Sequence, residues 1–186
     1  MTRYPILLAS ALALAVAAQP ASAGEEPTGF ADYPWGTTRR DLVGPCKFSP
    51  LPVEMFRSPD GSTTLLCDRK VPLGSATPYP RMVFVNDRLA AFLITVETHS
   101  YGDLRAVTIE KYGEPTARDT EEYTTGGGVR VSGEVLVWSW PSGTSVVLKQ
   151  RFGEVSAAGL VVSSKAYTDH MAAAKRIDME KAKKAF

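Results

Sequence analysis

Few side chains in this sequence combine the residue types and the spacing that chemistry requires. The only two histidines are His99 and His170, and Glu97 lies two residues before His99, on the same face of an expected strand. Two such ligands fall short of the three or four that a zinc site uses. The sequence therefore predicts no metal site, and no motif in it indicates a cofactor.

The catalytic candidates are three carboxylates, Asp119, Glu121 and Glu122, in a polar segment that we expect to form a loop. Paired carboxylates can cleave a glycosidic bond, but a catalytic acid needs burial to raise its pKa, and this segment predicts solvated side chains. The chain has no G-x-S-x-G motif. Residues 126–128, three glycines, lead into an expected strand, whereas a phosphate loop leads into a helix. We therefore expect a protein that is not an enzyme, with a cell-wall hydrolase as the least favoured alternative.

Aromatic side chains supply the candidate binding surface, which consists of Trp138, Trp140 and Tyr79. The two tryptophans share a strand face with Leu136. If exposed, they would stack on a sugar ring or on a partner protein. Large aromatic side chains usually bury much of their area, which favours the core instead. The pattern leaves a stacking surface and a packed core as alternatives.

The first 23 residues are typical of an export signal. Arg3 supplies the positive start, residues 6–18 the apolar stretch, and residues 21–23 a small-x-small cleavage site before Gly24. The apolar stretch is too short to span a bilayer, and no later segment reaches the roughly 20 apolar residues of a membrane helix. No cysteine lies at the expected cut, so a lipid anchor has no attachment point. We expect an exported protein, periplasmic or secreted, that neither spans the membrane nor carries a lipid.

Cys46 and Cys67 are the only cysteines, and in an exported chain they predict one disulfide bond. Such a bond would stabilise the fold by about 3 kcal/mol on the chain-entropy estimate. A redox role would favour a C-x-x-C spacing, which is absent. The pair is therefore expected to act as a structural cross-link.

Hydrophobic periodicity and turn signals predict an α+β fold, with antiparallel meanders, short helices packed on one face and a C-terminal helix. The expected helices cover residues 38–43, 101–112 and 167–186. The expected strands cover residues 53–57, 63–68, 81–85, 89–98, 129–132, 135–140, 144–150 and 155–163.

The signal over 1–23 would be followed by a single domain over 24–165 and a terminal helix or tail over 166–186. The first two helices each end at a Gly-Pro or Gly-x-Pro stop before a meander, so a weak internal repeat would divide the domain into 30–98 and 99–165. Loss of the signal removes one positive charge and brings the formal net charge from +1 to zero. A neutral chain lacks the electrostatic footprint of a nucleic-acid-binding protein.

Residues 33–44, followed by Cys46, by Cys67 in a strand and by residues 82–89, form a recognisable layout. It resembles the unit of β-lactamase-inhibitor-like proteins and of the SmpA/OmlA outer-membrane assembly lipoproteins, in which a G-x-T-x-x-x-V helix precedes a sheet ending in F-x-x-G-x-L. The resemblance covers about residues 33–97, with a fainter echo over 100–163. It implies a protein-binding or envelope-associated role.

Three hypotheses about function follow. The preferred one is an exported, non-enzymatic module that binds another envelope or secreted protein, as an accessory or as an inhibitor. The second is a carbohydrate or small-ligand binder in which the candidate aromatics stack on the ligand. The third is the hydrolase based on the carboxylates of residues 119–122.

Overall fold

A computed structural model describes residues 24–42, 46, 56–57 and 60–184. The expected export signal over 1–23 lies outside the described residues, as does most of the strand expected over 53–57. Within the described ranges, no helix is both long enough and apolar enough to cross a membrane.

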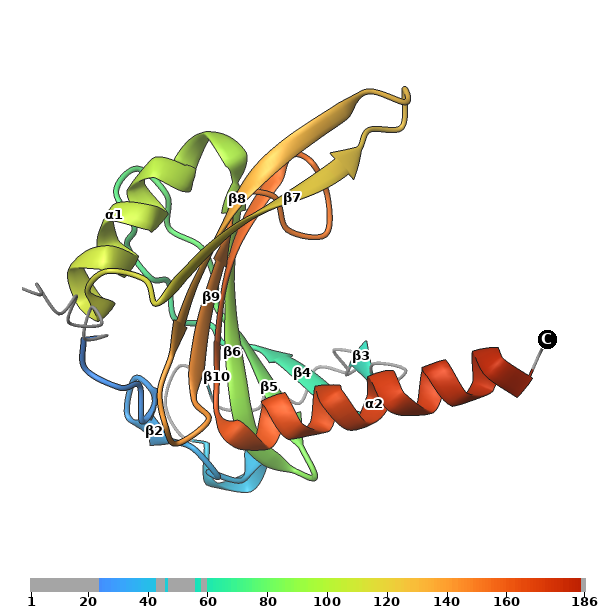
Figure 1. The fold of residues 1–186 in the computed structure, drawn as a ribbon. Helices are drawn as coiled ribbons and strands as arrows, with labels where there is room; N and C mark the ends of the chain where they lie inside the picture. Colours follow the sequence, from blue (N-terminus) through green and yellow to red (C-terminus); the bar gives the residue numbers. More distant parts are fainter. Residues whose placement is uncertain (1–23, 43–45, 47–55, 58–59, 185–186) are drawn as a thin grey trace, which may run out of the picture.

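One antiparallel sheet of eight strands organises the protein, in the order β3-β4-β5-β6-β10-β9-β8-β7 (Figure 1). The strands are β3 (Phe56–Arg57), β4 (Thr63–Leu66), β5 (Arg81–Val85), β6 (Arg88–Glu97), β7 (Ala117–Thr124), β8 (Arg130–Ser139), β9 (Ser145–Lys149) and β10 (Ala157–Ser163). Two four-stranded meanders, β3–β6 and β7–β10, meet where β6 pairs with β10. The architecture confirms the predicted α+β class.

Helix α1 (Tyr101–Tyr112) connects the two meanders and covers one face of the sheet (Figure 1). Its inward positions recur every three or four residues, the period of one helical face. They are Tyr101, Leu104, Thr108 and Tyr112. The helix ends at Gly113, whose φ of 72° suits glycine because a Cβ is disfavoured there. The predicted bounds of 101–112 are confirmed.

The core lies between α1 and the sheet, and an N-terminal hairpin closes it. Strands β1 (Gly29–Phe30) and β2 (Tyr33–Pro34) form this hairpin, and the Phe30 ring centroid is 4.6 Å from that of Phe92 on β6. Leu136, Leu148 and Leu160 point to the same side from the second meander and are buried. One apolar layer therefore joins both meanders.

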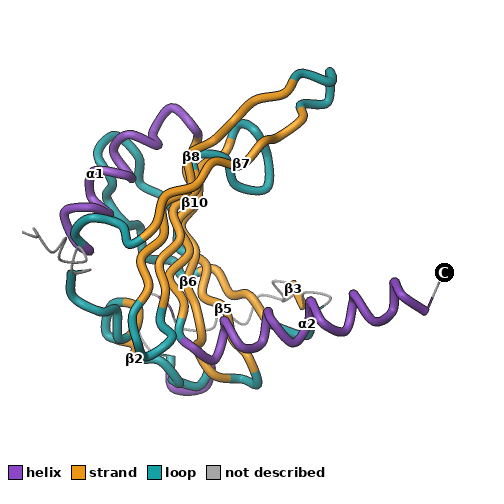
Figure 2. Tube along the Cα trace, viewed as in Figure 1, coloured by secondary structure: helices purple, strands orange, loops and turns teal. Residues whose placement is uncertain are grey.

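Helix α2 (Lys165–Lys184) leaves the end of β10 and runs past β6 and β5, on the face opposite α1 (Figure 2). The Ser164 hydroxyl donates a 2.8 Å hydrogen bond to the Ala90 carbonyl and fixes the start of this helix. No residue of α2 from Lys165 to Lys183 is buried, and residues 175–183 are all exposed. The C-terminal helix is confirmed, and its second half projects away from the sheet.

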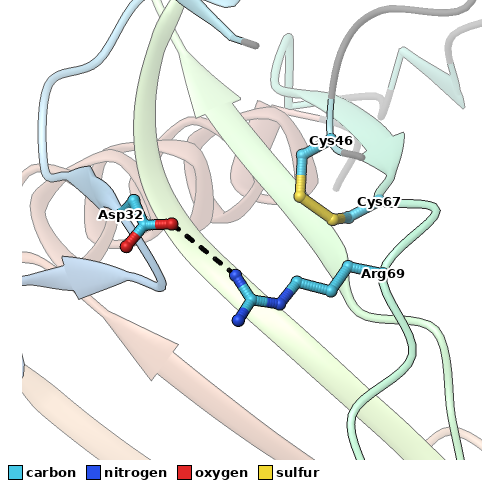
Figure 3. The surroundings of a disulfide bond; sticks show 4 residues. All are labelled: Asp32, Cys46, Cys67 and Arg69. Carbon is cyan, nitrogen blue, oxygen red and sulfur yellow. Dashed lines mark ion pairs between the residues drawn. A yellow bond between two sulfur atoms is a disulfide. The ribbon is translucent and has the colours of Figure 1, made fainter. Parts of the chain in front are cut away.

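The predicted Cys46–Cys67 disulfide is confirmed, with the two Cα atoms 4.3 Å apart (Figure 3). Both cysteines are buried. The Cys67 amide also donates a hydrogen bond to the Pro80 carbonyl, and this hydrogen bond holds the end of β4 against the start of β5. Arg69, two residues further along the chain, pairs with Asp32 of the N-terminal hairpin at 3.7 Å.

Three local predictions are wrong. Residues 117–124 form strand β7 rather than a loop, because β8 pairs with all eight of them although their own pattern is polar. Residues 130–139 form one strand rather than two, since Gly133 remains in the ladder opposite Glu121. The helix expected from residue 38 is only a 3-10 turn over Arg39–Asp41.

Candidate functional site

The candidate site is the face of the sheet that α1 does not cover, called here the open face. Seven side chains in direct cross-strand register form a line across it, one from each strand between β4 and β7. This cross-strand row is Leu66, Arg81, Leu93, Val161, Val147, Val137 and Ala117. None of the seven is buried, and Leu66 is 57% exposed.

The open face is unusual because the cross-strand row is apolar apart from Arg81, although no element of the described chain covers this row. Successive side chains of a strand point to opposite faces, and an antiparallel sheet covered on one side commonly alternates apolar and polar residues. Here Val161 and its neighbour Val162 are both apolar, and so are Val147 and its neighbour Val146. The inward member of each pair is buried and the outward member is partly exposed. The sequence thus places valine where solvent would favour a polar residue.

Two structural elements border the cross-strand row on the open face (Figure 1). At one end α2 crosses the sheet, and Val83, Ala91 and Ser163 are buried on this side of the strands. Beyond the other end lie the β7–β8 hairpin and the loop over residues 150–156. The ring of Phe152 covers Gly159, where an added Cβ would come within 2.4 Å of the ring. Glycine at 159 therefore allows this loop to lie close against the sheet.

An ion pair lies on the β7 side of the open face. Lys149 Nζ lies 2.6 Å from Glu121 Oε1, and the Tyr123 hydroxyl donates to Glu121 Oε2 at 2.5 Å. The hydrogen bonds from Lys149 and Tyr123 lower the pKa of Glu121, and burial together with the Glu121 carboxylate raises the pKa of Tyr123 to about 12. Glu121 is therefore ionised at neutral pH and paired with a cation.

This geometry does not suit the carboxylates for hydrolysis. Glu121 and Glu122 are adjacent on a strand, so their side chains point to opposite faces. A general acid needs a raised pKa, whereas that of Glu121 is lowered. Asp119 shares the face of Glu121, but its side chain is exposed. Glu121 therefore lacks the protonated state at neutral pH that the acid of a glycosidase needs.

The candidate aromatics do not form one surface. Trp138 is completely buried on the α1 side, where its indole Nε1 donates to the Gly113 carbonyl at 2.8 Å. Trp140 packs against the core, and its indole donates to the Gly24 carbonyl. Tyr79 is 41% exposed in the loop before β5, with Lys70 Nζ 5.3 Å from its ring centroid. Stacking by Trp138 is thus blocked by its burial.

The histidines lie apart from each other and from any cluster of ligands. His99 is exposed and 3.2 Å from Glu97, and His170 on α2 lies 3.7 Å from Asp60. The described part of the chain contains no group of three or more His, Cys, Asp or Glu side chains that could hold a metal ion.

The fold and the site define an α+β protein in which α1 covers one face of the sheet and the other face carries the partly exposed cross-strand row. Searches of family models, of curated proteins and of solved structures returned no match.

Proposed function

We propose that this protein is an exported, non-enzymatic module that binds another protein through the open face of its sheet. The observation that carries the proposal is the cross-strand row, a line that is apolar apart from Arg81 and in which none of the seven residues is buried. Contiguous exposed apolar surface on a folded protein marks an interaction site.

The row has the dimensions of a protein interface. Neighbouring strands lie about 4.8 Å apart, so six steps from Leu66 to Ala117 span about 29 Å. A stable interface buries about 800 Å² on each partner, with an apolar centre and a polar rim. The valines supply the centre, while Arg81 and the Lys149–Glu121 pair supply polar groups around it.

The partner is expected to use the face of the sheet rather than its edge. Edge strand β7 carries Arg118, Asp119, Glu121 and Glu122 among eight residues. Charged side chains on an edge oppose the addition of a further strand. A partner that packs an apolar loop or helix against the cross-strand row fits this surface best.

Export supports an envelope or extracellular partner. The N-terminal sequence has the form of a cleavable signal, and disulfide bonds persist in oxidising compartments. An envelope accessory and an inhibitor of a secreted protein are the two forms of this function, with the periplasm as the favoured compartment.

Affinity capture with matched variants tests the proposal. Val147→Glu places a charge in the centre of the row, and Val129→Glu makes the same change at the hairpin loop, where Val129 is 61% exposed. We expect a discrete envelope protein to be captured by the wild type and by Val129→Glu, and to be lost with Val147→Glu. Val147→Thr keeps the side-chain shape and places a polar group at the same position. It tests the centre of the row if the glutamate variant does not fold.

Equal capture by all three variants would reject the open face as the binding site. Capture of no discrete protein by the wild type would reject the binding function. Circular dichroism of each variant shows that a loss of capture does not result from unfolding.

A further inference from the structure

A cavity of about 320 Å³ lies on the opposite side of the sheet, between α1, the N-terminal hairpin and the loop over residues 69–73. Its floor is the centre of the sheet, where Phe92, Ile94 and Leu160 are buried. Phe30 and Leu104 form two of its walls. The volume falls at the lower end of the roughly 300–1,000 Å³ of small-molecule sites.

Charges of one sign border the cavity. Arg69, Lys70 and Lys111 contribute to its lining and are exposed, and among its described lining residues there is no aspartate or glutamate. Asp32 lies 3.7 Å from Arg69 (Figure 3). Its side chain is 95% exposed, so it offsets little of the positive charge.

Tyr112 at the end of α1 also lines the cavity, and the residue is 2% exposed. Burial raises the pKa of this phenol to about 12, so it remains protonated at neutral pH and can donate a hydrogen bond.

We propose that this cavity binds one single-chain anionic amphiphile, with the hydrocarbon chain on the sheet and the anionic group beside Arg69, Lys70 and Lys111. The apolar interior selects the chain, and the cations select the sign of the headgroup. The Tyr112 hydroxyl donates a hydrogen bond to the ligand.

The volume of the cavity matches a short hydrocarbon chain. At the roughly 30 Å³ that a water molecule occupies in the liquid, 320 Å³ holds about ten non-hydrogen atoms. A ten-carbon chain whose headgroup remains at the mouth matches this size. The site lies on the α1 side, so the proposal does not depend on partner binding at the open face.

Isothermal titration calorimetry of the purified exported protein tests the site with four probes of equal chain length. They are decanoate, decyl phosphate, decanol and decyltrimethylammonium, the three ionic probes below their micelle concentrations and decanol below its solubility limit. We expect saturable binding of one anionic probe per protein and at least tenfold weaker binding of the cationic probe. A comparison of decanoate with decyl phosphate distinguishes a carboxylate from a phosphate headgroup. Equal affinity for the cationic and anionic probes, or no saturable binding of either anion, would overturn the proposal.

Three variants locate the site. Val107 is 38% exposed and lines the cavity, so Val107→Trp should obstruct it and weaken binding of the better anion at least tenfold. Lys111→Glu should weaken binding of the same anion at least twofold, because removal of one exposed charge changes affinity by up to about fivefold and the glutamate adds repulsion. Tyr112→Phe removes only the hydroxyl and should cost about two- to tenfold.

Two controls keep these losses specific. Lys175→Glu reverses an exposed charge on α2, and Val129→Glu adds a negative charge at the exposed β7–β8 hairpin loop; both should bind the probe as the wild type does. A change in either control equal to that in Lys111→Glu would place binding elsewhere on the protein. Because Val107 and Lys111 lie at the surface of α1, these two variants are expected to fold, which melting curves verify.

Discussion

Removal of the disulfide bond should destabilise the protein by about 3 kcal/mol. In the double variant Cys46→Ala/Cys67→Ala, the unfolded chain gains the freedom that a cross-link with a sequence separation of 21 residues had removed. The chain-entropy relation gives about 3 kcal/mol for a loop of this length. This is a large share of the roughly 5–15 kcal/mol by which domains are stable.

Thermal and denaturant unfolding measure this effect. For a domain of 150–250 residues each kcal/mol shifts Tm by about 2–4 °C, so the double variant should melt about 6–12 °C below the oxidised wild type. Reductant should lower the wild-type Tm to a similar value and leave the variant unchanged. A Tm within about 2 °C of the oxidised wild type would refute the assigned role of this bond.

The remaining predictions concern the sheet. Burial raises the pKa of Glu134, but hydrogen bonds from Tyr101 and Arg105 outweigh it and hold that pKa below its usual value. The resulting stability is present above the unfolded pKa and is lost as pH falls through the folded pKa. The free energy of unfolding of Glu134→Gln should therefore decrease less than that of the wild type as the pH falls below about 4.3. The difference should be at most about 1 kcal/mol, because the group is partly exposed. Denaturant titrations at several pH values measure it, and the same pH dependence in variant and wild type would argue against this role of Glu134. Gly159→Ala should cost about 1–3 kcal/mol in urea unfolding, because the new Cβ meets the Phe152 ring at 2.4 Å, and a neutral change contradicts the close packing of that loop. Trp138→Phe should destabilise by about 2–4 kcal/mol, since it removes buried volume and leaves the Gly113 carbonyl without its donor; a loss below 1 kcal/mol disagrees with this placement.

Local signals in the sequence were sufficient for elements whose neighbours along the chain determine them. Helix α1 begins after Ser100 and ends at Gly113 as predicted, because periodic burial and a terminal glycine are properties of the segment itself. The disulfide was also predictable, since only two cysteines are present.

Long-range pairing determined what the sequence did not reveal. Strand β7 has a polar pattern typical of a loop and becomes a strand only because β8 pairs with it. The open face depends on the pairing of Leu93 with Val161, which are 68 positions apart and belong to different meanders. Alternation correctly placed Trp138 on the face of Leu136, but it did not indicate which face α1 would cover. Consecutive apolar residues such as Val146 and Val147 place apolar side chains on both faces of the sheet. They are the sequence signal that each face favours a packing partner.

Site-specific photo-crosslinking in the producing cells tests the central claim most directly. A photoreactive amino acid at Val147 or Val161 would report on the open face, and one at Val129 on the hairpin loop. We predict one discrete adduct, of the same mass, from positions 147 and 161 and none from position 129. Adducts from position 129 alone, or no adduct from positions 147 and 161 in cells that export the protein, would contradict binding at the open face.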